Sequence, residues 1–106
     1  MDINLAPEAS ISEDQRFVQF AACLPHRTVL CAISREALEL YFWVPKAADE
    51  KRLLQAYVDG RTRIAVAVER GLRRKEREPI VLRAERFSKS LPRFRELSLR
   101  LFMRQA

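Results

Sequence analysis

Few residues of this chain have the type and spacing that catalysis or metal binding needs. The one histidine, His26, follows Pro25 in a predicted turn, and nucleophilic catalysis needs a partner held within hydrogen-bond reach. Cys23 and Cys31 offer only two thiols, whereas zinc takes about four ligands at short local spacings. We therefore expect His26 at the surface, both cysteines as small buried apolar residues, and no metal, cofactor or enzymatic activity.

Two further chemistries are disfavoured by where their residues fall. Gly60 and Gly71 lie inside a predicted helix, so the glycine-rich loop that cradles phosphates between a strand and a helix is excluded. Glu36 and Glu39 are about one helical turn apart. We interpret them as an anion near a helix N-terminus and part of a solvated helix face rather than as a catalytic carboxylate pair.

Arginine provides the strongest indication of a function. Residues 1–49 carry 4 basic and 7 acidic side chains, whereas residues 50–106 carry 16 basic and 7 acidic ones. Such a basic tract is typical of nucleic-acid binding driven by counterion release, and aromatic residues in the tail could stack on bases. A solvated helix face, or a genome rich in G and C, explains the same count. The candidate contacts to an anion or nucleic acid are Arg63, Arg70, Arg73, Arg74, Arg77, Arg93, Arg95 and Arg100.

Arg61 stands near the middle of an otherwise apolar stripe. A buried charge needs a partner, since leaving it unpaired costs several kcal/mol, on the order of 3–5. We expect a charge pair with Glu36 or Glu39, or contacts to exposed backbone carbonyls. The alternative is that Arg61 forms the floor of an anion-binding pocket.

The element that positions these residues is a long helix predicted over Asp49 to Arg77, with Asp49 as its cap. Its apolar residues recur at three- and four-residue spacing and define one face. Gly60 predicts a kink or close packing, and Gly71 marks where the helix frays. The predicted stripe consists of Leu54, Tyr57, Val58, Ile64, Ala65, Val68 and Leu72.

The remaining elements predict a small α+β domain. Arg16–Leu24 and Thr28–Ile33 predict a hairpin with apolar residues on both faces, more than half buried; a three-residue turn would put its cysteines on one face and a two-residue turn on opposite faces. Ser34 caps a short helix that ends near Pro45. Ile80–Phe87 predicts a third strand. The expected fold is a three-stranded antiparallel sheet packed against a short and a long helix, in the order β-β-α-α-β.

Domain organisation follows from length and composition. The 106 residues, 48% hydrophobic and 32% charged, predict one soluble globular domain over residues 15–87. Residues 1–14 are predicted to be a flexible lead-in without signal-peptide features, and no stretch has the roughly 20 apolar residues of a membrane span, so we expect a cytoplasmic location. Residues 88–106 predict a basic amphipathic extension that forms a third helix or, by its alternation over 97–101, a strand.

The segments Phe17–Phe20, Val29–Leu38, Leu53–Tyr57, Arg61–Ile64 and Ile80–Leu82 together resemble a small bacterial family, catalogued as domain of unknown function 1488. The resemblance covers about residues 15–85, and its most specific part is Cys-x-Ile-Ser-x-Glu-Ala-Leu at positions 31–38. It implies a compact α+β domain with a small antiparallel sheet packed on helices. It implies no activity, and it does not bear on the tail.

The function expected from the sequence is a non-catalytic cytosolic interaction or accessory domain that binds an unidentified protein or itself. The homodimer is suggested by Leu97, Leu99, Leu101 and Phe102, which are more apolar than a free tail in water should be. The alternative is a non-specific nucleic-acid-binding, regulatory protein that uses the basic helix face and tail.

Overall fold

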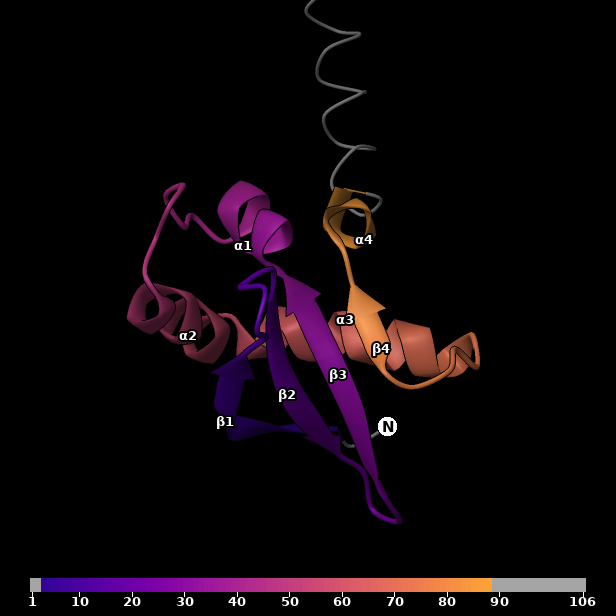
Figure 1. Ribbon diagram of the computed structural model, residues 1–106. Helices are drawn as coiled ribbons and strands as arrows, with labels where there is room; N and C mark the ends of the chain where they lie inside the picture. Colours follow the sequence, from indigo (N-terminus) through magenta and orange to yellow (C-terminus); the bar gives the residue numbers. More distant parts are fainter. Residues whose placement is uncertain (1–2, 89–106) are drawn as a thin grey trace, which may run out of the picture.

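The computed structural model describes residues 3–88 as a single sheet with helices on one face and at one end (Figure 1). The strands lie in the order β1-β2-β3-β4. The elements in chain order are β1 (Asn4–Ile11), β2 (Phe17–Cys23), β3 (Thr28–Ser34), α1 (Arg35–Tyr41), α2 (Glu50–Asp59), α3 (Arg61–Arg73), β4 (Ile80–Leu82) and α4 (Ala84–Ser88).

The α+β class is confirmed, but the sheet differs from the predicted one in two ways. It has four strands, because Asn4–Ile11 forms β1 and pairs antiparallel with β2, where a loose lead-in was expected. It is also mixed, because β4 pairs parallel with β3. Three helices intervene between β3 and β4, and such a crossover connection is what brings a chain back parallel.

The predicted hairpin is confirmed as β2 and β3, with Cys23 paired to Thr28 and Phe20 paired to Cys31. Leu24 N–H donates to the Arg27 carbonyl at 2.8 Å, so Pro25 and His26 alone form the two-residue turn. This register places the two cysteines on opposite faces of the sheet: Cys31 is buried on the helix side and Cys23 is exposed on the other.

Local capping positions both helices that the sequence placed after the hairpin. The Ser34 hydroxyl accepts a hydrogen bond from Ala37 N–H at 3.0 Å, and the Asp49 carboxylate accepts one from Arg52 N–H at 2.9 Å. Each contact satisfies a backbone donor that the first turn of a helix leaves without an intrahelical partner. The predicted starts of the short helix and of the long helical segment are therefore confirmed.

The predicted long helix is two helices, α2 and α3, divided at Gly60. Gly60 has φ −98° and ψ 11°, which interrupts the helical conformation without a left-handed residue. The break changes which residues face the core. Leu53, Ala56 and Tyr57 are buried from α2, whereas Val58 of the predicted stripe is 39% exposed. The last residue of α3 is Arg73, so the helix does not reach Arg77.

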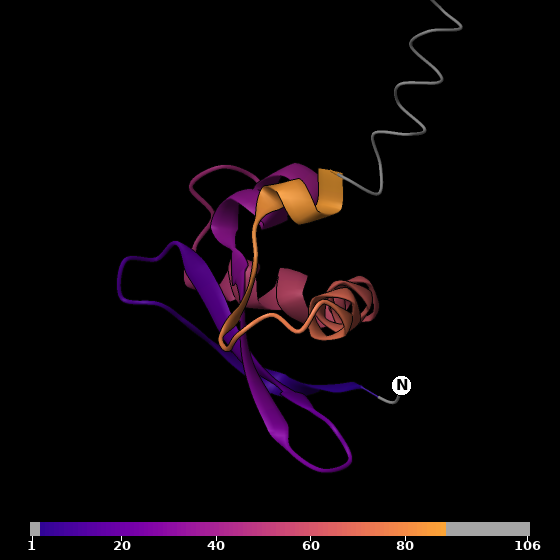
Figure 2. The same ribbon diagram turned by 90° about the vertical axis from the view of Figure 1, so that its right-hand side faces the viewer.

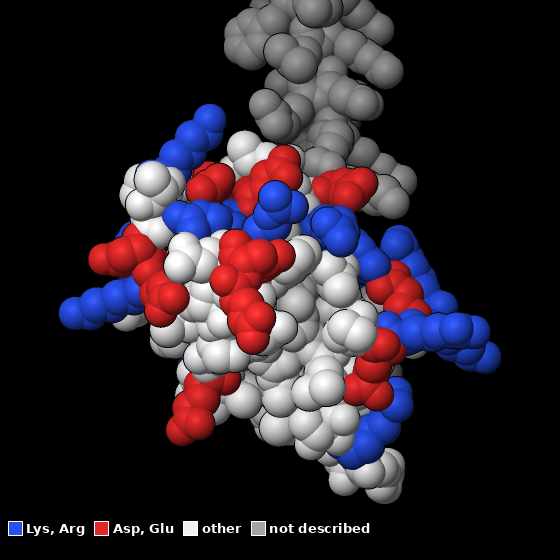
Figure 3. Space-filling view, viewed as in Figure 1, with Lys and Arg blue, Asp and Glu red and all other residues white. Residues whose placement is uncertain are grey.

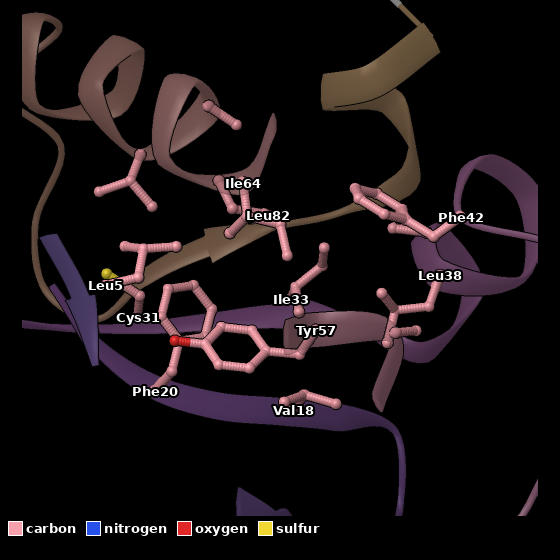
Figure 4. Packing of buried hydrophobic residues seen from close by; sticks show 14 of the residues in the cluster. Leu5, Val18, Phe20, Cys31, Ile33, Leu38, Phe42, Tyr57, Ile64 and Leu82 are labelled. Atoms are coloured by element: carbon pink, nitrogen blue, oxygen red, sulfur yellow. The ribbon is translucent and has the colours of Figure 1, made fainter. Parts of the chain in front are cut away.

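The core lies between the inner face of the sheet and the helices α2 and α3 (Figure 2). Tyr57 is its largest fully buried side chain, and its ring stands 4.9 Å from that of Phe20 (Figure 4). Burial raises the pKa of the Tyr57 phenol to about 12, and its hydroxyl donates to the Ala6 carbonyl. Tyr57 of α2 therefore contacts both the edge strand β1, through the Ala6 carbonyl, and the central strand β2, through Phe20.

The helices α1 and α4 lie side by side at one end of the sheet (Figures 1 and 2). The Phe87 ring makes an edge contact with Phe42 at 5.2 Å and a tilted one with Tyr41 at 6.2 Å. The segment after Leu82, predicted to continue as strand to Phe87, is instead this short helix. Because α4 begins after the last strand, the Phe87 side chain packs against α1 and closes that end of the core.

Candidate interaction surface

The predicted basic contacts gather only in part. Arg70, Arg73, Arg74 and Arg77 are exposed near the end of α3 and in the turn before β4, with Lys75 among them. The blue side chains at the right of Figure 3 lie over this end of α3. Arg73 forms an ion pair with Glu69, four residues earlier in α3. The other predicted contacts, Arg93, Arg95 and Arg100, lie outside the described residues.

Arg63 has a structural role that the basic pattern did not predict. Its Nη1 donates to the Tyr41 carbonyl at 2.7 Å, and its guanidinium stands 4.3 Å from the centre of the Phe42 ring. Trp43, which is 82% exposed and has φ 58°, lies beyond it at 5.8 Å. Arg63 therefore ties α3 to the end of α1, and these contacts reduce its freedom to bind an external anion.

Arg61 is half-buried at the start of α3, where the predicted apolar stripe placed it. Its Nη1 is 3.5 Å from the Leu5 carbonyl of β1, which is the backbone contact we expected as one alternative. Glu39, a predicted partner, pairs with Arg35 at 3.3 Å instead, and Glu36 is exposed in the first turn of α1. Arg61 also lies close enough to Tyr57 to favour its ionised form, although desolvation outweighs that effect.

The residues considered for catalysis and metal binding are spread apart. Within residues 3–88 there is no group of three or more His, Cys, Asp or Glu side chains that could hold a metal ion. His26 is exposed in the hairpin turn. Burial raises the pKa of the Cys31 thiol to about 12, with a smaller contribution from the Glu78 carboxylate, so this thiol stays protonated at neutral pH. Cys31 is therefore not placed as an activated nucleophile.

The outer face of the sheet has no helix over it among the described elements (Figure 2). Side chains alternate across a strand, so the buried Val18, Phe20 and Ala22 of β2 identify the inner face, and their neighbours point outward. Leu30 is the most prominent outward residue, at 62% exposed. The outward positions of the three consecutive strands are Phe17, Gln19, Ala21, Cys23, Thr28, Leu30, Ala32, Ser34 and Val81.

This outer face carries no charge at any strand position of β2, β3 or β4. In the space-filling view an uncharged area extends below and to the right of a group of acidic side chains near the centre, and other charged side chains stand around it (Figure 3). The surface around Leu30 is formed by small residues, because Ala21 is its cross-strand partner and Ala32 follows two positions along β3. The outward face of a two-layer sheet is normally polar, so an uncharged one with a projecting leucine is unusual for a surface in water.

The rim of the outer face is ordered by specific contacts. At one end the Arg83 guanidinium stands 5.4 Å from the centre of the Phe17 ring. In the turn between β1 and β2, the Ser12 hydroxyl donates to the Asp14 carboxylate at 2.6 Å, and this bond, with a second from Arg16 N–H, lowers the pKa of Asp14. The charged residues at this end therefore lie around the apolar surface and not within it.

The two edges of the sheet are poorly suited to pairing with another strand. The β1 edge contains Pro7 and a change of register between Leu5 and Ala9. The β4 edge is three residues long. Before β4 begins, the Glu78 carboxylate accepts a hydrogen bond from Leu30 N–H at 2.7 Å and so occupies a free donor of β3. Proline, bulges and short edge strands all oppose edge-to-edge association, so the outer face is the part of the sheet that is open to a partner.

The outer face is visible in the sequence as strand segments without charged residues. The segments Phe17–Cys23, Thr28–Ser34 and Ile80–Leu82 contain no charged residue in a chain that is 32% charged. As a separate point, no helix within residues 3–88 is long and apolar enough to cross a membrane.

Comparison with known proteins supports the resemblance drawn from the hairpin and helix motifs. Neither the curated proteins nor the solved structures include a match to this chain. One family model, described as protein of unknown function (DUF1488), matches residues 4–82, from the start of β1 to the end of β4. The chain therefore belongs to the DUF1488 family.

Proposed function

We propose that this protein is a small, non-catalytic interaction domain whose contact surface is the outer face of the sheet. The observation that carries the proposal is the absence of charge from every outward position of β2, β3 and β4, around an exposed Leu30. Protein interfaces are depleted of charged residues at their centre and keep charge at the rim. The outer face has the same arrangement, because its strand positions are uncharged and charged side chains such as Arg83 lie at its rim.

The non-catalytic part of the proposal is supported by the state of the reactive side chains. Cys31 is buried with a thiol pKa raised to about 12, so a thiolate is scarce where a nucleophile would need it. Tyr57 is held in the core by its hydrogen bond to the Ala6 carbonyl. Both side chains are buried in the core, with Tyr57 0% and Cys31 3% exposed.

Photo-crosslinking in the cell of origin tests the proposal. A photoreactive phenylalanine analogue at position 30 would sit at the centre of the outer face, and the same analogue at position 66 would sit on α3. Val66 is a matched control, because it is 48% exposed on the helix layer that covers the opposite side of the sheet. We expect discrete protein adducts from position 30 and none above background from position 66. Equal adducts at both positions, or none at position 30, would contradict the proposal.

Binding of nucleic acid is a second candidate, favoured by the exposed basic residues at the end of α3. Replacing Arg70, Arg74 and Arg77 together by serine should weaken binding of a short single-stranded DNA or RNA and reduce the slope of log affinity against log salt. A control variant of equal charge replaces Arg16, Arg27 and Lys46, which are also exposed. No binding at low salt by the unchanged chain would remove this candidate.

A further inference from the structure

We propose that the outer face is covered by a second copy of this chain, stacked face to face about a two-fold axis with Leu30 of each copy over Ala21 and Ala32 of the other. This inference rests on the proposed interaction function and names its partner. It assigns the dimer contact to the described sheet, where the sequence pointed to the C-terminal tail.

The shape around Leu30 favours a copy of itself. In a two-fold interface the same surface serves both partners, so a projection must be matched by a hollow on the same surface. Leu30 supplies the projection. The hollow is formed by two small side chains: Ala21, which is paired with Leu30 on β2, and Ala32, which lies two residues further along β3. Packed sheets stand about 10 Å apart, a spacing that a leucine facing an alanine can fill.

Charge also favours a second copy over nucleic acid. Nucleic acid needs cationic side chains at the contact, and the outward positions of β2, β3 and β4 have none. The strand positions of two such faces can meet without burying an unpaired charge, which would cost on the order of 3–5 kcal/mol. The Glu78 carboxylate, which accepts from Leu30 N–H at 2.7 Å, is exposed at the β4 edge of the face. The full chain carries a formal net charge of +6, of which residues 3–88, with 15 basic and 12 acidic side chains, contribute +3. Physiological salt screens the resulting repulsion between two copies.

The area of the outer face sets how strong the dimer should be. Two strands of seven residues and one of three cover about 270 Å² by standard strand spacings. A stable interface buries roughly 800 Å² on each partner, so the face and its rim fit a reversible dimer at the weak end of specific association. The monomer core is complete on the inner face, so dissociation leaves each copy folded.

Analytical ultracentrifugation of the full-length chain tests this inference. From about 10 µM to about 1 mM, the range for weak association, the average mass should rise from 12.4 kDa toward twice that value. Leu30→Arg should weaken dimerisation at least about 100-fold, because the two-fold axis places the new charge in the interface twice. Val66→Arg adds the same charge on α3 and should leave the dimerisation constant unchanged.

Cys23 provides a probe of the outer face that needs no substitution. It is exposed on that face, whereas the chain's other cysteine, Cys31, is buried. The rate at which N-ethylmaleimide labels each Cys23 thiol should fall as the concentration of unchanged protein rises through the dimerisation range. In the Leu30→Arg variant the rate should stay constant with concentration.

Four results would overturn the inference. The first is a monomer at 1 mM with Cys23 labelled at one rate throughout. The second is a monomer in which Cys23 is protected at every concentration, which would indicate that the chain's own C-terminal segment covers the face. The third is a dimer lost in Val66→Arg and kept in Leu30→Arg. Crosslinks from position 30 to a different protein, with no adduct of two chains, would also overturn it while leaving the proposed interaction function intact.

Discussion

Gly60 is the position where a single methyl group should have the clearest effect on stability. It divides α2 from α3, its N–H donates to the Ala56 carbonyl at 2.9 Å, and its carbonyl accepts from Ile64 N–H at 3.0 Å. A Cβ placed on Gly60 would stand 2.6 Å from two carbons of the Phe42 ring. Gly60→Ala therefore tests whether close packing explains why glycine occupies this break.

Two opposing effects decide the size of the change. Alanine is favoured over glycine in a helix by up to about 1 kcal/mol. Carbon atoms pack at about 3.5–4.0 Å, so the Phe42 ring would have to move by roughly 1 Å. That ring is fixed between Phe87 at 5.2 Å and the Arg63 guanidinium at 4.3 Å. Overpacking of this kind costs about 1–3 kcal/mol, so we expect a net loss of about 1–2 kcal/mol.

Urea denaturation followed by far-ultraviolet circular dichroism measures this change as a lower midpoint at constant slope. Gly71→Ala is the matched control, since its Cβ would meet Ile80 Cγ2 at 3.1 Å and the Glu76 carboxylate at 3.2 Å. There the helix gain and a smaller adjustment should cancel to within about 0.5 kcal/mol. The penalty at position 60 should disappear in a Phe42→Leu background. An unchanged midpoint for Gly60→Ala, or an equal penalty in both backgrounds, would refute the packing argument.

Three further predictions concern buried and capping groups. The folded state holds the pKa of both Tyr57 and Cys31 near 12, above their ordinary values of 10.0 and 9.0, so the free energy of unfolding should fall as pH rises through 9 to 12. Urea titrations at pH 8, 10 and 11 should show a smaller fall in Tyr57→Phe, and an equal fall would contradict the assignment. Ser34→Ala should cost about 1 kcal/mol in a urea titration because the Ala37 N–H loses its cap, and Asp49→Ala should cost less because that cap is exposed. In the native chain, mass spectrometry after thiol labelling should find one label on Cys23, with Cys31 labelled only in urea; two native labels would show that Cys31 is accessible.

The elements that the sequence predicted correctly are those with local signals. Ser34 and Asp49 each place a side-chain oxygen next to the first turn of a helix, and each forms the cap that its position predicts. The alternation in β2 and the turn at Pro25 predict the hairpin for the same reason. Capping and turn geometry depend on residues within a few positions of each other, so they are largely independent of tertiary contacts.

The elements that were missed depend on distant partners. β1 contains Pro7 and few strand formers, and it is held by pairing to β2 and by the Tyr57 hydroxyl at the Ala6 carbonyl. The parallel direction of β4 follows from the path of three helices, which no local pattern contains. Because the helix breaks at Gly60, the buried residues of α2 and α3 do not form one continuous stripe. Gly60 also packs closely on Phe42, which is distant in sequence.

The hairpin shows how far the candidate surface could have been inferred. Apolar residues on both faces predicted burial on both sides, and the described helices cover only the inner face. A monomer that needed only one buried face would lose nothing by placing lysine or glutamate at the outward positions near Leu30. Proteins avoid such apolar faces where they are not used, because exposed apolar patches promote unwanted association. The same uncharged strands therefore account for both the inner core and the outer contact, and the charge of Leu30→Arg should affect only the second.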